Sequence, residues 1–114
     1  MDFTASPGEL VALFDRVTPA DPDVSRRKMF GWPSAFVAGR MFTGLHKDSI
    51  VIRLDRADLA TFLALPGARP FEPMPGRAMT GYAVVPQSML ADEPELRRWL
   101  DRSLVFTRGL PPKK

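Results

Sequence analysis

The sequence predicts an α+β domain with two layers: a mainly antiparallel β-sheet, and helices packed on one face of it. Short apolar runs follow one another in the middle of the chain, separated by turns of two residues. Turns this short fit antiparallel strands, because parallel strands need connections of a dozen or more residues. Segments with apolar residues at helical spacing flank these runs, which is typical of helices covering an antiparallel sheet.

The totals are consistent with one domain over residues 1–114. A chain of 114 residues, with 45% hydrophobic and 25% charged residues, is ordinary for a globular protein that buries a single core. The absence of cysteine excludes disulfides, thiol nucleophiles and cysteine-based metal sites, and it fits a reducing compartment. The net charge of +3 is too small to indicate a nucleic-acid partner by itself.

The N-terminal segment predicts the first helix. Ser6 is suited to cap it, Pro7 to occupy its first position, and Glu9 to complete a capping box. A proline- and aspartate-rich loop, Thr18 to Asp23, follows the helix. The apolar stripe of this helix consists of Leu10, Leu13, Phe14 and Val17.

Strands are expected next. The run from Arg26 to Phe30 predicts a short strand, which leads through a Gly-Trp-Pro turn into a meander of three further strands. Gly39-Arg40 and Asp48-Ser49 supply its two tight turns. The three runs of the meander are Ser34 to Ala38, Met41 to Lys47 and Ile50 to Leu54.

A second helix begins after the meander. Asp55 is a suitable N-cap, and Gly67 is the expected stop. Pro70 to Gly76 contains three prolines, so it is expected to be an edge strand or a loop. Met79 to Val85 predicts the last clear strand. The apolar face of the second helix consists of Leu59, Phe62 and Leu63.

The last helix is expected to begin after Asp92 as its N-cap and to end at Gly109, before a flexible tail over residues 110–114. The expected order of elements is α-β-β-β-α-β(β)-α. Its first three strands are the three runs of the meander. The buried stripe of this helix consists of Leu96, Trp99, Leu100 and Leu104.

The second face of the sheet is unusual. Helices on one face should leave the other face polar, yet Ser34 to Ala38 and Met79 to Val85 are apolar at most positions. Either the last helix wraps round to that face, or another molecule covers it. A protein partner or a second copy of the chain is therefore expected there.

Several short motifs resemble the N-terminal domain of the TfoX family (also called Sxy), bacterial regulators of natural competence. This resemblance implies a two-layer fold like that of type III secretion chaperones and a non-enzymatic, transcription-related role. Full-length competence regulators carry a second, C-terminal domain, and this chain ends soon after the first. The matching residues are Arg27 to Gly31, Phe36, Gly39, Met41-Phe42, Ile52 to Asp55, Pro70-Phe71, Met79, Tyr82, Pro86, Leu96 and Trp99.

No catalytic or cofactor site is predicted. His46 is the only histidine, and although Asp48 would share its face of a strand, a solvated histidine at the end of a hairpin is the preferred interpretation. The acidic residues fall at helix starts, where capping explains them. No phosphate-binding loop is present. We therefore expect no enzyme, no metal and no cofactor.

Basic and aromatic residues supply the candidate binding surface. Alternation along a strand sends Arg26 and Lys28 to one face of the sheet and Arg27 to the other. Contact with a protein is the main prediction for this surface, and contact with DNA phosphates is the second use considered. Trp32 is expected to be an exposed anchor. The residues assigned to the surface are Arg27, Lys28, Trp32, Arg40 and Arg53.

The alternative function is a chaperone-like or dimeric interaction module with no nucleic-acid role. The last helix also carries four arginines, but neighbouring acids such as Glu95 favour an ordinary solvated face. No apolar run reaches the length of about 20 residues that crosses a bilayer. The N-terminus lacks the basic start and apolar stretch of a secretory signal, so a cytoplasmic location without membrane contact is expected. The four arginines are Arg97, Arg98, Arg102 and Arg108.

Overall fold

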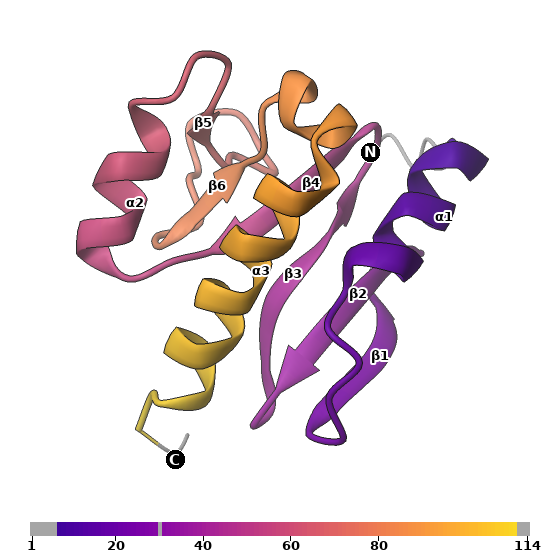
Figure 1. Ribbon diagram of the computed structural model, residues 1–114. Coiled ribbons are helices and arrows are strands. Elements are labelled where there is room, and N and C mark those ends of the chain that lie inside the picture. The colour runs from indigo at the N-terminus through magenta and orange to yellow at the C-terminus, as the bar shows by residue number, and fades with distance from the viewer. Residues whose placement is uncertain (1–6, 30, 112–114) are drawn as a thin grey trace.

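A sheet of six strands, all paired antiparallel, runs through the computed structural model in the order β1-β2-β3-β4-β6-β5. The structure describes residues 7–29 and 31–111. Three α-helices lie on the same side of the sheet (Figure 1), so the predicted α+β class is confirmed. The strands are β1 (Val24–Met29), β2 (Trp32–Val37), β3 (Arg40–His46), β4 (Ser49–Arg53), β5 (Arg69–Pro70) and β6 (Tyr82–Val84). The helices are α1 (Gly8–Val17), α2 (Arg56–Leu63), α3 (Glu93–Arg108) and the short 3₁₀ helix η1 (Gln87–Ala91).

Four strands precede α2, so the expected order is wrong in counting three. The strand left out of that count is β1, which the run from Arg26 to Phe30 does predict. It begins earlier, at Val24, and pairs along its whole length with β2, from Val24 opposite Val37 to Met29 opposite Trp32. Its four central residues are exposed. The sheet therefore has a six-residue strand at one edge and only the two residues of β5 at the other.

The starts of α2 and α3 are capped as predicted. The Asp55 carboxylate accepts a 2.7 Å hydrogen bond from the Asp58 N–H, and the Asp92 carboxylate accepts one of 3.3 Å from the Glu95 N–H. The predicted start of α1 is wrong by one residue, because Pro7 has an extended ψ of 143° and lies just before the helix. Ser6, the expected cap, lies outside the described residues. Helix α2 ends at Leu63, earlier than the expected stop at Gly67.

The main core lies between the sheet and the helices. The large side chains of Phe14, Phe42 and Phe62 are fully buried there. The Ser103 hydroxyl of α3 donates a 3.0 Å hydrogen bond to the Phe42 carbonyl, which links the central helix to β3. The helices therefore cover the centre of this face, while the central residues of the edge strand β1 stay exposed.

The opposite face carries a second, smaller apolar cluster, and the chain itself packs on it. The proline-rich segment after β5 supplies Phe71, whose N–H bonds to the Tyr82 carbonyl at 3.2 Å, and Met79, whose N–H bonds to the Phe71 carbonyl at 2.9 Å. Helix α3 lies on the other side of the sheet, so the alternative in which the last helix wraps round to this face is wrong. The proline-rich segment supplies cover that the sequence analysis did not consider, and contact with a second molecule stays a prediction. The members of this second-face cluster are Met41, Val51, Phe71, Tyr82 and Val84, with Met29, Phe36 and Met79 packed against them.

The last strand, predicted from Met79 to Val85, is shorter because the chain turns before it reaches the sheet. The Tyr82 N–H bonds to the Met79 carbonyl at 3.2 Å, and Gly81 has a positive φ of 89°. The chain therefore turns between Met79 and Gly81, and only Tyr82 to Val84 continue as β6.

Candidate binding surfaces

The edge strand β1 presents basic side chains on both faces of the sheet. Arg26 points to the helix side, where its guanidinium lies 5.0 Å from the centre of the Phe14 ring and pairs with Asp15 at 2.5 Å. Arg27 points to the second face, where its guanidinium lies 4.4 Å from the centre of the Phe36 ring. Because strand residues alternate, Lys28 shares the side of Arg26. The predicted alternation is confirmed, and Arg27 and Lys28 do not form one flat surface.

The backbone of β1 is open on its outer side. The Val24 N–H bonds to the Asp21 carbonyl at 2.9 Å, and not to β2. Hydrogen-bonded and outward-facing residues alternate along an antiparallel edge strand. The N–H and C=O groups of Arg26 and Lys28 therefore face away from β2, and both residues are exposed. Within the described part of the chain, no strand pairs with this side.

The remaining predicted cations lie at the second face and near α3. The Arg53 guanidinium is 5.5 Å from the centre of the Tyr82 ring, an arrangement similar to that of Arg27 over Phe36. Arg40 donates a 2.6 Å hydrogen bond to the carbonyl of Pro111, just beyond the end of α3. Arg40 thus holds the segment after α3, at residues where the sequence predicts a loose tail.

Trp32 is buried, and its expected exposure is wrong. Only 7% of its surface is exposed, because its ring packs 4.8 Å from the ring of His46, which in turn lies 5.0 Å from the ring of Phe71. Trp32 and His46 lie on neighbouring strands, but Phe71 comes from the proline-rich segment. Trp32 therefore forms a wall inside the molecule and does not stand out as an anchor.

An apolar pocket of about 560 Å³ lies beside this aromatic row. It is enclosed between the second face of the sheet and the proline-rich segment, and its walls come from both. Four of the six methionines of the chain line it, together with Trp32 and Phe71. These methionines are Met29, Met41, Met74 and Met79.

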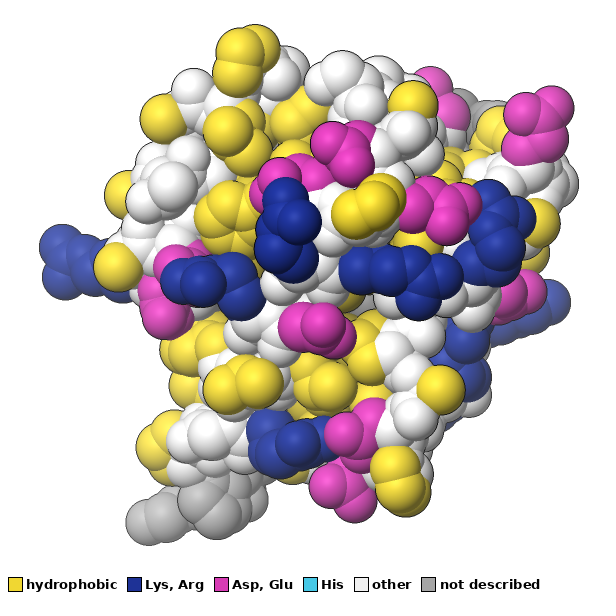
Figure 2. Space-filling view, in the orientation of Figure 1, with side chains coloured by type: hydrophobic (Ala, Val, Ile, Leu, Met, Phe, Trp, Pro, Cys, Tyr) yellow, Lys and Arg dark blue, Asp and Glu magenta, His cyan; other side chains and the backbone are white. Residues whose placement is uncertain are grey.

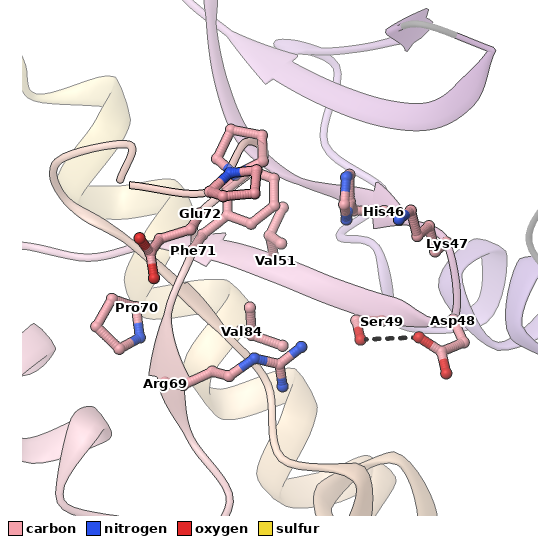
Figure 3. A pocket seen from close by; sticks show the side chains of 12 residues that line it. His46, Lys47, Asp48, Ser49, Val51, Arg69, Pro70, Phe71, Glu72 and Val84 are labelled. Carbon is pink, nitrogen blue, oxygen red and sulfur yellow. Dashed lines mark hydrogen bonds between the residues drawn. The ribbon is translucent and has the colours of Figure 1, made fainter. Parts of the chain in front are cut away.

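A polar hollow of about 470 Å³ adjoins the apolar pocket and shares His46, Lys47 and Phe71 with it. Figure 3 shows this hollow, with Arg69 of β5 on one side and the turn after β3 on the other. The Ser49 hydroxyl bonds to the Asp48 carboxylate at 3.3 Å, while the Glu72 carboxylate points away from His46. Burial, with the charges of Lys47 and Arg69, lowers the pKa of His46 below its ordinary 6.5.

The apolar pocket lined by methionines was not predicted from the sequence. Its walls combine β1, β2 and β3 with the segment from Phe71 to Met79, and the sequence does not show that this segment folds back onto the sheet. One signal is present: Phe71, Met74 and Met79 are apolar residues in a proline-rich stretch that otherwise resembles a solvated loop. Apolar residues in such a stretch indicate that it packs against something.

The arginines of α3 mostly pair with acids, as the preferred interpretation predicts. Arg98 pairs with Glu95 on the same helix, but Arg102 pairs with Asp58 of α2, at 2.8 and 2.7 Å. Arg108 donates a 2.6 Å hydrogen bond to Asp21 in the loop before β1. Figure 2 shows basic and acidic side chains interspersed over this helix-covered face. The helix side is therefore a mixed surface without a continuous basic stripe.

Metal sites and membrane-spanning helices are both absent from residues 7–29 and 31–111. In this part of the chain, no three side chains of the metal-binding types lie close enough together to hold an ion. None of the helices described there combines the length and the apolar character required to cross a membrane.

Comparison with protein families identifies one that covers most of the chain. The family described as the TfoX N-terminal domain matches residues 15–107, which run from α1 to nearly the end of α3. No curated protein shows significant similarity to the chain. Because the family match covers most of the sequence, the chain belongs to the TfoX N-terminal domain family.

Proposed function

We propose that the chain is a non-enzymatic regulatory module, of the kind found in competence regulators, that binds a protein partner along the edge of strand β1. The partner supplies an extended, acidic segment that adds to the sheet as a further strand. The observation that carries this proposal is the open outer side of β1, with exposed basic residues on both of its faces.

Strand addition uses the backbone for affinity and the side chains for selectivity. The outward N–H and C=O groups of Arg26 and Lys28 provide the backbone part. Arg27 on the second face and Lys28 on the helix side then select acidic residues at neighbouring positions of the incoming strand, one on each face. Within the described part of the chain, neither Arg27 nor Lys28 forms an ion pair, whereas Arg26 pairs with Asp15.

A second copy of the chain fits this edge poorly. Two β1 strands paired antiparallel would bring three consecutive basic residues of one copy against those of the other, and like charges opposite each other destabilise a sheet. A dimer through this edge is therefore disfavoured. The apolar second face, which suggested a dimer, is largely occupied by the proline-rich segment.

Contact with DNA phosphates has weaker support. Five arginines, on α1, β1 and α3, form ion pairs, which reduces the positive potential around them. A chaperone-like role without nucleic acid would use the same β1 edge. A role in catalysis is disfavoured because His46 lies among aromatic rings, and the carboxylate nearest in sequence, Asp48, bonds to Ser49.

The test is affinity capture from the native organism with matched charge variants. The β1 variant carries Arg27→Glu and Lys28→Glu. The control variant carries Arg56→Glu and Arg97→Glu, two exposed residues on the helix side, and so has the same net charge. We expect the unaltered protein and the control to recover the same acidic protein after nuclease treatment, and the β1 variant to lose it.

Two results would contradict the proposal. If the β1 variant recovers the same partner as the control, the partner binds elsewhere. If nuclease removes every captured protein, the chain contacts nucleic acid and not a protein edge.

A further inference from the structure

The segment from Phe71 to Met79 covers the apolar pocket, and backbone hydrogen bonds hold it in a hairpin-like shape. The Phe71 N–H bonds to the Tyr82 carbonyl at 3.2 Å, and the Met79 N–H bonds to the Phe71 carbonyl at 2.9 Å. At its tip, Met74 and Arg77 form an isolated bridge, with an N–H to carbonyl distance of 2.9 Å. The pocket therefore lies between two ordered walls, the sheet on one side and this segment on the other.

The pocket has the size and lining of a small-molecule site. Its volume of about 560 Å³ lies within the range of about 300–1,000 Å³ that is typical of such sites. Methionine dominates the lining, and flexible thioether side chains adapt to apolar ligands of varied shape. Met74 is 55% exposed, which is unusual for a large apolar residue and places it at the mouth.

The charges are at one end of the pocket. Lys47 lines both the apolar pocket and the adjoining polar hollow, and Arg69 lines the hollow. Two acids, Asp48 and Glu72, also line the hollow, and the Glu72 carboxylate points away from His46 (Figure 3). Neither acid lines the apolar pocket, whereas Lys47 does.

We propose that this pocket binds a small amphipathic carboxylate, with its apolar body among the four methionines and its carboxylate at the junction of Lys47 and Arg69. The size of the pocket and the position of the two cations together favour this class of ligand. The pocket includes only Met29 of β1 and uses none of the outward backbone groups of that strand, so this inference does not depend on the proposed function.

The first experiment locates the ligand with methyl signals of methionine. Protein labelled with ¹³C in the methionine methyl groups is titrated with decanoate below its micelle concentration, and signals are assigned with Met→Leu variants. We expect saturable shifts for Met29, Met41, Met74 and Met79. Met89, which is buried on the helix side of the sheet, is the internal control and should not shift.

The second experiment tests the charge of the ligand. Decanoate, decanol and decyltrimethylammonium have the same apolar chain and differ in the head group. We expect decanoate to bind about tenfold more tightly than decanol, the difference of one hydrogen bond to a charged group, and the ammonium compound to bind least. The Lys47→Gln/Arg69→Gln variant should bind decanoate no better than decanol, whereas an Arg56→Gln/Arg97→Gln variant should retain the difference.

Each other result overturns the proposal. Shifts that do not saturate, or that affect Met89 as much as the pocket methionines, show that no site exists. Equal affinity for decanoate and the ammonium compound shows that the charge assignment is wrong. A short apolar peptide that shifts the same four methyls and binds more tightly than decanoate shows that the pocket is an anchor for protein side chains.

Discussion

The hydroxyl of Tyr82 in β6 donates a 2.6 Å hydrogen bond to the backbone carbonyl of Met41 in β3, passing over β4, which lies between them in the sheet. Tyr82 is buried, and this burial raises the pKa of its hydroxyl. Arg53 lies over the Tyr82 ring, and Phe71 bonds to its backbone. Tyr82 thus connects the basic end of the second face to the segment that covers the pocket.

Replacing Tyr82 with phenylalanine should destabilise the protein by about 1–2 kcal/mol, because the buried Met41 carbonyl loses its side-chain donor. Urea unfolding should show a lower midpoint with an unchanged slope. Val105→Ala, at a position that is 68% exposed, is the control and should change stability by less than about 0.5 kcal/mol. Equal stability of Tyr82→Phe and the unaltered protein would show that this bond is unimportant.

Gly44 should tolerate no larger residue while Ser34 keeps its hydroxyl. A Cβ at Gly44 would lie 2.7 Å from the Ser34 Oγ on the neighbouring strand. Gly44→Ala should therefore cost about 1–3 kcal/mol, and Ser34→Ala should remove part of that cost in the double variant. The four unfolding curves form a double-mutant cycle, and purely additive effects would argue against this close contact.

The Asp58–Arg102 pair should make stability depend on acid pH. The hydrogen bonds from Arg102 hold the pKa of Asp58 below its ordinary 3.8, so the stabilisation is present above that pH and is lost as pH falls through the folded-state pKa. Asp58→Asn should be less stable than the unaltered protein at neutral pH, and the difference should shrink toward about pH 3.

The Arg102 side chain is 58% exposed, so added salt should also reduce the effect of Asp58→Asn. Asp101→Asn, at an exposed position on the same helix, is the matched control and should have little effect at any pH. A difference between Asp58→Asn and the unaltered protein that stays constant from neutral to acid pH would contradict the ion pair.

His46 should also make the stability of the protein depend on pH. As with Asp58, stability should fall as pH falls, but nearer neutral pH. Its pKa is lowered mainly by burial, so the unfolded chain binds a proton more readily than the folded protein does. Stability should therefore decrease as pH falls through about 6.5. His46→Gln should flatten the stability curve between about pH 5 and 7 in urea titrations. An equally steep curve in the variant would show that another group is responsible.

Local features of the fold could be predicted from the sequence. Capping by Asp55 and Asp92 depends on residues only three positions away, and both caps are present. The alternation of Arg26 and Arg27 depends only on the geometry of a strand, and it also holds. These relationships need no knowledge of what packs against them.

Relationships between distant segments could not be predicted in the same way. Trp32 is buried because His46 and Phe71 pack beside it, and Phe71 belongs to a segment that the sequence presents as an edge strand or loop. Arg102 and Asp58 are 44 positions apart, so no local pattern in the sequence links them. The methionine-lined pocket likewise exists only because the proline-rich segment returns across the sheet.

The most direct test of binding at β1 is amide exchange, measured residue by residue in the free protein and in the complex with the captured partner. Strand addition predicts that the outward amides of Arg26 and Lys28 exchange rapidly in the free protein and slowly in the complex. The amide of Arg27, which faces β2, should be protected in both. Unchanged exchange at Arg26 and Lys28 in a saturated complex would contradict the account.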